Sequence, residues 1–153
     1  MYLINSLKTL IEERKLLLRG LESLSEEKYF IIPQNFKNNI AWNLGHIIVT
    51  QQFLHYSLSR LELQIPKEFV SYYRTGTSPA NWKENPNITE LKETLIELPH
   101  KFIADFESGR FKEFRPYKTS TGISLDTLEQ AVTFNHFHEG VHTGIILNLM
   151  KNF

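Results

Sequence analysis

The sequence predicts an all-α protein, a four-helix bundle with a long crossover between its second and third helices. At 153 residues and 41% hydrophobic content, the chain is large enough for one domain, 1–153, with a real core. Four segments repeat their apolar residues at helical spacing, namely 2–22, 38–61, 88–108 and 124–151. The stretch between the second and third segments, 62–87, has no period and is too long for a passive turn.

The first predicted helix, 2–22, carries leucines at alternating steps of three and four residues. They are Leu3, Leu7, Leu10, Leu17, Leu21 and Leu24. Only Arg14 breaks this series, while most charged residues fall outside it. The pattern is typical of a helix that packs one face against a core.

The second predicted helix, 38–61, begins at the capping residues Asn38 and Asn39 and is apolar on two sides. One stripe contains Ile40, Leu44, Ile47, Leu54, Leu58 and Leu61. The other contains Trp42, Val49, Phe53 and Tyr56. Because a helix that is apolar on two sides is buried on two sides, we expect the second stripe to form a homodimer interface.

The crossover 62–87 contains four aromatic residues, which we expect to anchor it over the bundle rather than to line a pocket mouth. The third helix, 88–108, begins at a capping box formed by Asn87 and Glu90. Pro99 is expected to kink or split this helix, and Gly109 ends it. A polar segment with a turn signal, 110–123, then leads to the last helix.

The last helix, 124–151, with Ser124 as its expected N-cap, carries His138 and His142 on its apolar face. Residues four apart on a helix lie about 40° apart around its axis, so the two imidazoles can reach one point. Buried imidazoles that do not bind a metal each need a hydrogen-bond partner. The pair therefore favours a metal site over a structural role.

A catalytic zinc-type site needs three protein ligands and one open position. His46 is the best third ligand, because it lies between the two apolar stripes of the second helix. His55 points about 180° away from His46 on the same helix, so both cannot face one site. We expect His55, His100 and His136 to be surface or partly buried residues.

Two glycines of the last helix, Gly140 and Gly144, lie on the side away from the histidines. Glycine in a helix interior costs about 1 kcal/mol relative to alanine, so two of them need a reason. Small residues four apart allow another backbone to approach closely. We expect a neighbouring helix or the crossover to pack there.

Composition excludes several classes of function. Lys+Arg and Asp+Glu both total 17, so a neutral chain without a basic block is not expected to bind nucleic acid. The absence of a long apolar run and of a signal-peptide pattern predicts a cytoplasmic protein with no membrane partner. With no cysteine in the chain, any thiol chemistry would use a small-molecule thiol.

Two motifs resemble the DinB-like (YfiT-like) superfamily. The first is the block from Asn39 to Ile47, which contains Trp42, Gly45 and His46; the second is His138-x-x-x-His142-x-Gly144-x-Ile146. The resemblance implies a four-helix bundle in which His46, His138 and His142 bind a divalent metal. It also implies that the chain acts on a small-molecule substrate, since some relatives transfer or rearrange groups with a low-molecular-weight thiol.

Three functional hypotheses follow. The first is a mononuclear zinc or nickel enzyme, either a thiol-dependent S-transferase or a hydrolase. The second is a di-iron carboxylate protein, suggested by the Glu-x-x-His spacing at Glu139–His142 and Glu97–His100. It fails because the second helix has no carboxylate and Pro99 interrupts the other motif. The third is a non-enzymatic, dimeric helical stress or binding protein with a structural metal.

Overall fold

The computed structural model describes residues 1–153 and confirms the all-α class. Its α-helices are α1 (Tyr2–Gly20), α2 (Ile40–Gln52), α3 (Lys67–Tyr73), α4 (Ile88–Glu107) and α5 (Leu128–Met150). Three single turns, η1 (Glu26–Tyr29), η2 (Phe53–Ser57) and η3 (Pro79–Asn81), accompany one small hairpin of β1 (Tyr117–Lys118) and β2 (Ser124–Leu125). None of the helices combines the length and apolarity needed to cross a membrane.

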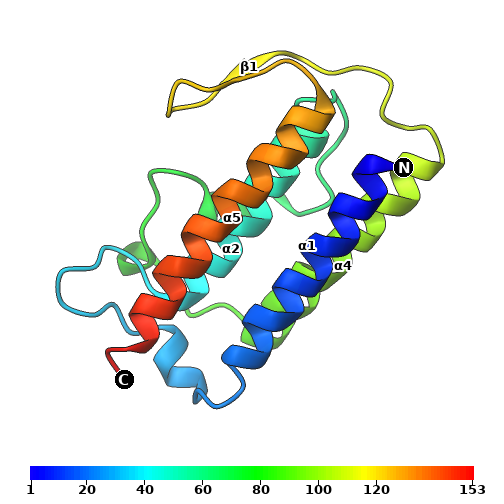
Figure 1. Ribbon diagram of the computed structural model, residues 1–153. Coiled ribbons are helices and arrows are strands. Elements are labelled where there is room, and N and C mark those ends of the chain that lie inside the picture. Colours follow the sequence, from blue (N-terminus) through cyan, green and yellow to red (C-terminus); the bar gives the residue numbers. More distant parts are fainter.

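Each of the four long helices packs against two of the others. Helix α1 contacts α4 and α5, and α2 also contacts α4 and α5. Figure 1 shows α1 beside α4 and α2 beside α5, with the short hairpin over one end. Buried side chains of all four helices, such as Leu17, Leu44, Leu95 and Ile146, form the largest core cluster. The helix faces predicted from apolar spacing therefore meet inside the chain.

Helix α2 continues as the π-helical turn η2, where the Leu58 N–H donates to the Phe53 carbonyl at 3.1 Å. The predicted helix 38–61 thus divides into a shorter α-helix and a wider turn. In the second apolar stripe, Trp42, Val49 and Tyr56 are buried within one chain, whereas Phe53 is partly buried. Trp42, Val49 and Tyr56 are therefore not exposed for a dimer interface, and that part of the prediction is wrong. The homodimer itself stays a prediction.

The crossover contains the short helix α3, which the sequence pattern did not reveal. Its Tyr73 is buried against α2, and a Cβ atom on Gly45 would overlap the Tyr73 ring. Phe69, Tyr72 and Trp82 pack against the same core, so the aromatic residues do anchor the crossover. The close approach predicted for the last helix occurs here instead, on α2.

The two glycines of α5 have no such neighbour. A Cβ atom on Gly140 or Gly144 would meet nothing within 4 Å. The prediction that another element packs closely on these glycines is wrong. Gly140 instead lines an open groove of about 410 Å³ between α1 and α5.

The start of α5 also differs from the prediction. The N-cap is Thr127, whose Oγ1 accepts from the Gln130 N–H at 3.3 Å. Ser124, the predicted cap, lies in β2 and pairs with Lys118 of β1. Two-residue strands carry too little periodicity to be read from sequence.

Pro99 does not split α4, which runs continuously from Ile88 to Glu107. Proline lacks an N–H, so the carbonyl four residues earlier, that of Leu95, loses its helical donor. The Arg14 guanidinium from α1 replaces it, with Nη1 2.5 Å from the Leu95 oxygen. The residue that breaks the leucine series therefore compensates for the proline.

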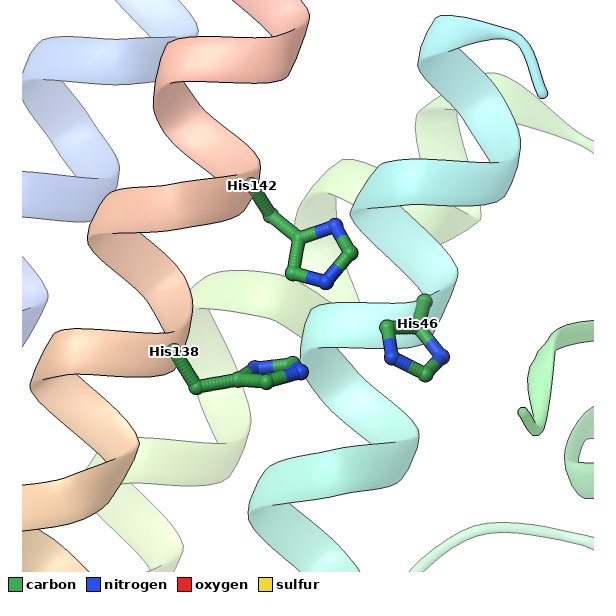
Figure 2. A group of neighbouring side chains, drawn as sticks. All are labelled: His46, His138 and His142. Atoms are coloured by element: carbon green, nitrogen blue, oxygen red, sulfur yellow. The ribbon is translucent and has the colours of Figure 1, made fainter. Parts of the chain in front are cut away.

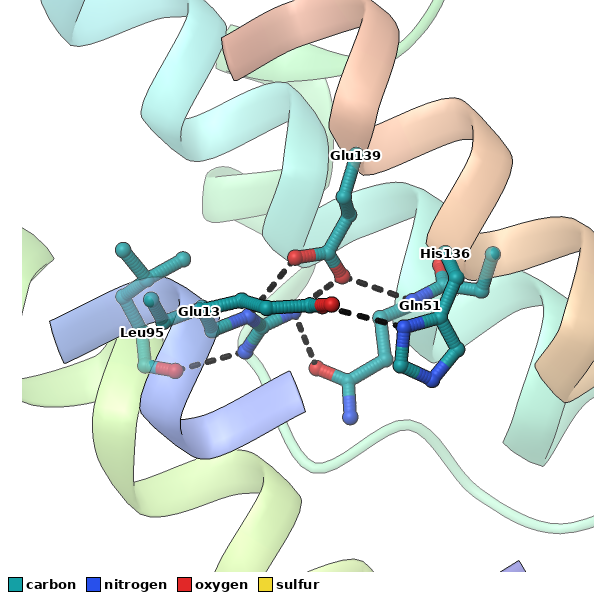
Figure 3. Close-up of polar contacts among 7 residues, drawn as sticks. Glu13, Gln51, Leu95, His136 and Glu139 are labelled. Atoms are coloured by element: carbon teal, nitrogen blue, oxygen red, sulfur yellow. Dashed lines mark hydrogen bonds and ion pairs between the residues drawn. The ribbon is translucent and has the colours of Figure 1, made fainter. Parts of the chain in front are cut away.

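Arg14 also makes a buried ion pair with Glu139 of α5, through Nε at 2.9 Å and Nη2 at 2.6 Å. Nη2 donates in addition to Gln51 of α2, and Asn135 donates to Glu139. We call these five residues, Arg14, Gln51, Leu95, Asn135 and Glu139, the Arg14 hub (Figure 3). The hub joins all four long helices and fixes α5 in rotation around its axis.

Candidate metal centre

The structure brings together the three histidines that the sequence singled out. His46 extends from α2 and His138 and His142 from α5, and the three rings converge between the two helices (Figure 2). One ligand atom of each lies within 4.8 Å of the others. The ring centroids are 4.5–5.1 Å apart. His55, His100 and His136 are not part of this group.

Two of the rings are oriented by hydrogen bonds at Nδ1. His46 Nδ1 lies 2.8 Å from the Tyr73 carbonyl oxygen, and His142 Nδ1 lies 2.8 Å from Asn43 Oδ1. The Asn43 amide is itself fixed, because its Nδ2 donates to the Asn39 carbonyl at 2.7 Å. Both oxygens only accept, so each Nδ1 carries the proton and each Nε2 keeps a lone pair. This is the pattern of outer partners that metal-binding histidines use.

The Tyr73 carbonyl is free to accept because Tyr73 is the last residue of α3. Carbonyls in the last turn of a helix have no backbone donor within that helix. Gly45 lets the Tyr73 ring approach α2, which brings this carbonyl to His46. Gly45 therefore leaves the space in which the Tyr73 ring packs, and this packing brings the Tyr73 carbonyl to His46.

Burial keeps the three imidazoles neutral. It lowers the pKa of His138 to about 3, with added repulsion from His142 and His46. It lowers the pKa of His142 to about 4, and repulsion from His46 contributes. The pKa of His46 is lowered by burial too, although the Tyr73 carbonyl partly opposes this. Neutral imidazole is the form that binds a metal ion, so no proton has to leave at neutral pH.

The residues fit a divalent ion of the zinc or nickel type. Three neutral nitrogen donors suit such an ion, and nitrogens around a tetrahedral ion lie about 3.4 Å apart. Separations of up to 4.8 Å need only small ring movements to reach that value. His138 Nδ1 is buried and has no hydrogen-bond partner within the chain, so only packing orients this ring. The Trp42 ring stacks on His46 at 4.6 Å and covers one of its faces.

Two cavities adjoin the histidines. One, of about 680 Å³, is lined by His46 and His138, the turn η2, the β1–β2 hairpin and the first half of the crossover. The other, of about 620 Å³, is lined by His46, Trp42 and the loop 75–78. His46 and Thr75 belong to both linings. Of the three histidines, His46 lines both cavities, His138 lines only the first and His142 lines neither.

The other histidines have different environments. His55 is fully buried against Phe102, which corrects the prediction of a surface or partly buried residue. Both of its nitrogens lack partners, and burial lowers its pKa to about 3. His136 is held between Ser6 and Glu13 on α1, and His100 is exposed. Glu139 of the rejected di-iron motif binds Arg14 instead.

Sequence reasoning missed Asn43 and Tyr73 as partners of the ligands. Asn43 lies one helical turn before His46 and is buried, so a polar residue at a core position was the available signal. Tyr73 acts through its backbone carbonyl, which no side-chain pattern could reveal.

A family model described as the DinB superfamily matches residues 9–146, which include all three histidines. The chain belongs to the DinB superfamily. No curated protein matches the chain. Membership of the superfamily agrees with the resemblance of the two histidine motifs.

Proposed function

We propose that this DinB-superfamily chain is a mononuclear metalloenzyme built on a four-helix bundle with a crossover between α2 and α4. His46, His138 and His142 would hold one zinc or nickel ion. The observation that carries the proposal is that His46 lines two cavities at once. A structural zinc site is closed by four protein ligands, whereas a catalytic site keeps a position open.

An ion in this site would supply a nucleophile, because it lowers the pKa of a bound water or thiol. The chain would keep the three imidazoles neutral through burial. The Tyr73 carbonyl orients the His46 ring, and Asn43 orients the His142 ring. No carboxylate lines either cavity, so the chain offers no acidic side chain as a general base there. Deprotonation of the nucleophile would therefore depend on the ion.

Two cavities that meet at one ligand favour a reaction between two bound molecules. A hydrolase needs one substrate and water, whereas a transferase must hold a donor and an acceptor side by side. We therefore favour group transfer, with an external low-molecular-weight thiol as one reactant, over hydrolysis. The absence of cysteine from the chain is consistent with an external thiol.

Metal titration of the chelator-treated protein tests the proposal. We expect about one divalent ion per chain, followed through tryptophan fluorescence in a Trp82→Phe background, so that the signal comes from Trp42, which stacks on His46. His138→Ala should abolish tight binding, while Asn43→Ala should weaken it about 10–100-fold because it removes an outer partner. His100→Ala is the matched control, since His100 is exposed and lies outside the site. Equal losses in His138→Ala and His100→Ala would contradict the site.

A further inference from the structure

We propose that the 680 Å³ cavity beside His46 and His138 binds an amphipathic monoanion, a molecule with an apolar body and one carboxylate, sulfonate or similar group. We call it the aromatic cavity. This inference rests on the proposed function in one respect: the bound molecule would present its reactive group to the metal centre. Its volume is in the range of cavities that hold small-molecule ligands.

The apolar part of the proposal rests on the walls of the aromatic cavity. The Phe53 and Tyr117 rings meet edge-on with their centroids 5.1 Å apart, and the centroids of the Phe134 and Phe137 rings are 5.8 Å apart. Phe137 remains 58% exposed and Val141 46% exposed, although both line this cavity. Large apolar side chains exposed together at a cavity mouth indicate a surface that a ligand covers.

The anionic part rests on Arg74. It is the only lysine, arginine, aspartate or glutamate in the lining of this cavity. Arg74 forms no ion pair elsewhere in the chain. Its backbone is fixed as the C-cap of α3, where its N–H donates to the Val70 carbonyl at 3.0 Å. An unpaired guanidinium with a fixed backbone is well suited to bind a carboxylate or sulfonate.

Hydroxyl groups and the metal centre add to this preference. Thr75 follows Arg74, and the hairpin contributes Thr119, Ser120 and Thr121 to the same lining. The Thr119 and Thr121 hydroxyls bond to each other at 2.9 Å, which leaves the Thr75 and Ser120 hydroxyls and one proton of that pair to donate to an anion. A divalent ion at the histidines would raise the positive potential further, so a cationic ligand would be disfavoured on two counts.

Calorimetric titration with octane-1-sulfonate tests the proposal, because a sulfonate is an anion that binds metal ions weakly. Octan-1-ol and octylammonium are the matched neutral and cationic probes, and each is titrated into metal-free and metal-loaded protein. We expect the sulfonate to bind more tightly than the alcohol, and the ammonium ion to bind least. Arg74→Gln should weaken sulfonate binding about 10–100-fold, as expected for loss of a charged hydrogen-bond donor, and leave the alcohol unchanged.

Two further variants separate charge from shape. Arg74→Lys keeps the charge and should retain most of the sulfonate affinity, whereas Phe137→Ser should weaken the sulfonate and the alcohol alike. Equal binding of sulfonate and ammonium, or an Arg74→Gln variant with unchanged sulfonate affinity, would overturn the proposal. Failure of the histidines to bind metal would be seen separately in the Trp42 titration, and sulfonate binding that depends on Arg74 would survive it.

Discussion

The Arg14 hub and the three histidines are both polar groups inside an apolar core, yet they are satisfied in opposite ways. Arg14 is 2% exposed and its donors reach Glu139, Gln51 and the Leu95 carbonyl. At the histidines, the buried His138 Nδ1 has no partner and His46 Nε2 has only a long contact of 3.4 Å to Thr50 Oγ1, and two cavities adjoin the group. Within the hub the Arg14 and Glu139 charges are paired with each other, although Gln51 Nε2 and Asn135 Oδ1 have no partner, whereas the histidine site borders open space.

This difference separates a structural role from a binding role. Buried charges are normally paired, so an ion pair that is completed within the chain indicates a structural role. An incomplete set beside a cavity indicates that something outside the chain completes it. Removing a hub residue should therefore affect stability, and removing a site residue should affect metal binding.

The largest effect is expected at Arg14. Arg14→Met leaves the Glu139 carboxylate buried without its cation, and loss of one partner of a buried ion pair costs about 3–5 kcal/mol. Urea denaturation at neutral pH would measure the change in the free energy of unfolding. The double variant Arg14→Met/Glu139→Leu should recover part of that loss, because no uncompensated charge remains. A loss below about 1 kcal/mol in the single variant would show that the hub is not structural.

The sequence identified the three histidines as a site, but for the hub it showed only isolated irregularities. The four-residue spacing of His138 and His142, and the inward position of His46, are local properties of helices, so a helical wheel was sufficient. Arg14 was visible as a break in the leucine series, and Pro99 as a defect in its helix. Arg14 donates to the Leu95 carbonyl that Pro99 leaves without a donor. This contact depends on how α1 packs against α4, and no local sequence pattern contains that information.

The second largest effect, on the pH dependence of stability, is expected at His55. This residue is buried as the hub residues are, but both of its ring nitrogens lack hydrogen-bond partners. Its pKa of about 3 in the folded chain lies below its ordinary value of 6.5, chiefly because burial disfavours the charged ring. Arg14 and His136 disfavour that charge further. Between these two values the unfolded chain holds a proton that the folded chain lacks, so stability is full above about pH 6.5 and is lost as the pH falls.

His55→Leu should therefore make the metal-free protein less sensitive to acid. Each such histidine contributes a slope of about 1.4 kcal/mol per pH unit within its window. Unfolding measured from pH 4.5 to 6.5 should show a shallower slope in the variant, with no loss of stability at pH 7. His100→Ala, at an exposed position, should leave the slope unchanged. An unchanged slope in His55→Leu would mean that the ring titrates normally in the folded protein.

His55 also shows that a helical wheel predicts the direction in which a side chain points but not whether it is buried. The wheel correctly placed it away from His46, but the expectation of a surface or partly buried residue was wrong, because the ring is fully buried. In the structure α2 and η2 are covered by α3, α4 and α5 together. The His55 ring packs against Phe102 of α4, and which segment covers a helix face depends on how the helices pack, which a wheel of one helix does not contain.

A smaller effect is expected at Gly45. An alanine there would overlap the Tyr73 ring, and overpacking of this kind costs about 1–3 kcal/mol. Because the Tyr73 carbonyl orients His46, the displacement should also weaken metal binding. Loss of stability and loss of metal affinity in the same variant, by urea denaturation and by the Trp42 titration, would join α3 to the site. Full metal affinity in a destabilised Gly45→Ala variant would contradict that connection.

The smallest effect, and the opposite sign, is expected at Gly144. A Cβ atom there meets nothing within 4 Å, and α5 is helical at this position. Alanine should therefore stabilise the protein by about 0.5–1 kcal/mol, because it restricts the unfolded chain and favours the helix. Metal affinity should not change, since Gly144 lies on the side of α5 away from the histidines. Gly45→Ala and Gly144→Ala make the same chemical change on the two helices that carry the ligands. If Gly144→Ala instead lowered stability, a neighbour absent from the single chain, such as a second copy, would have to pack on this face of α5.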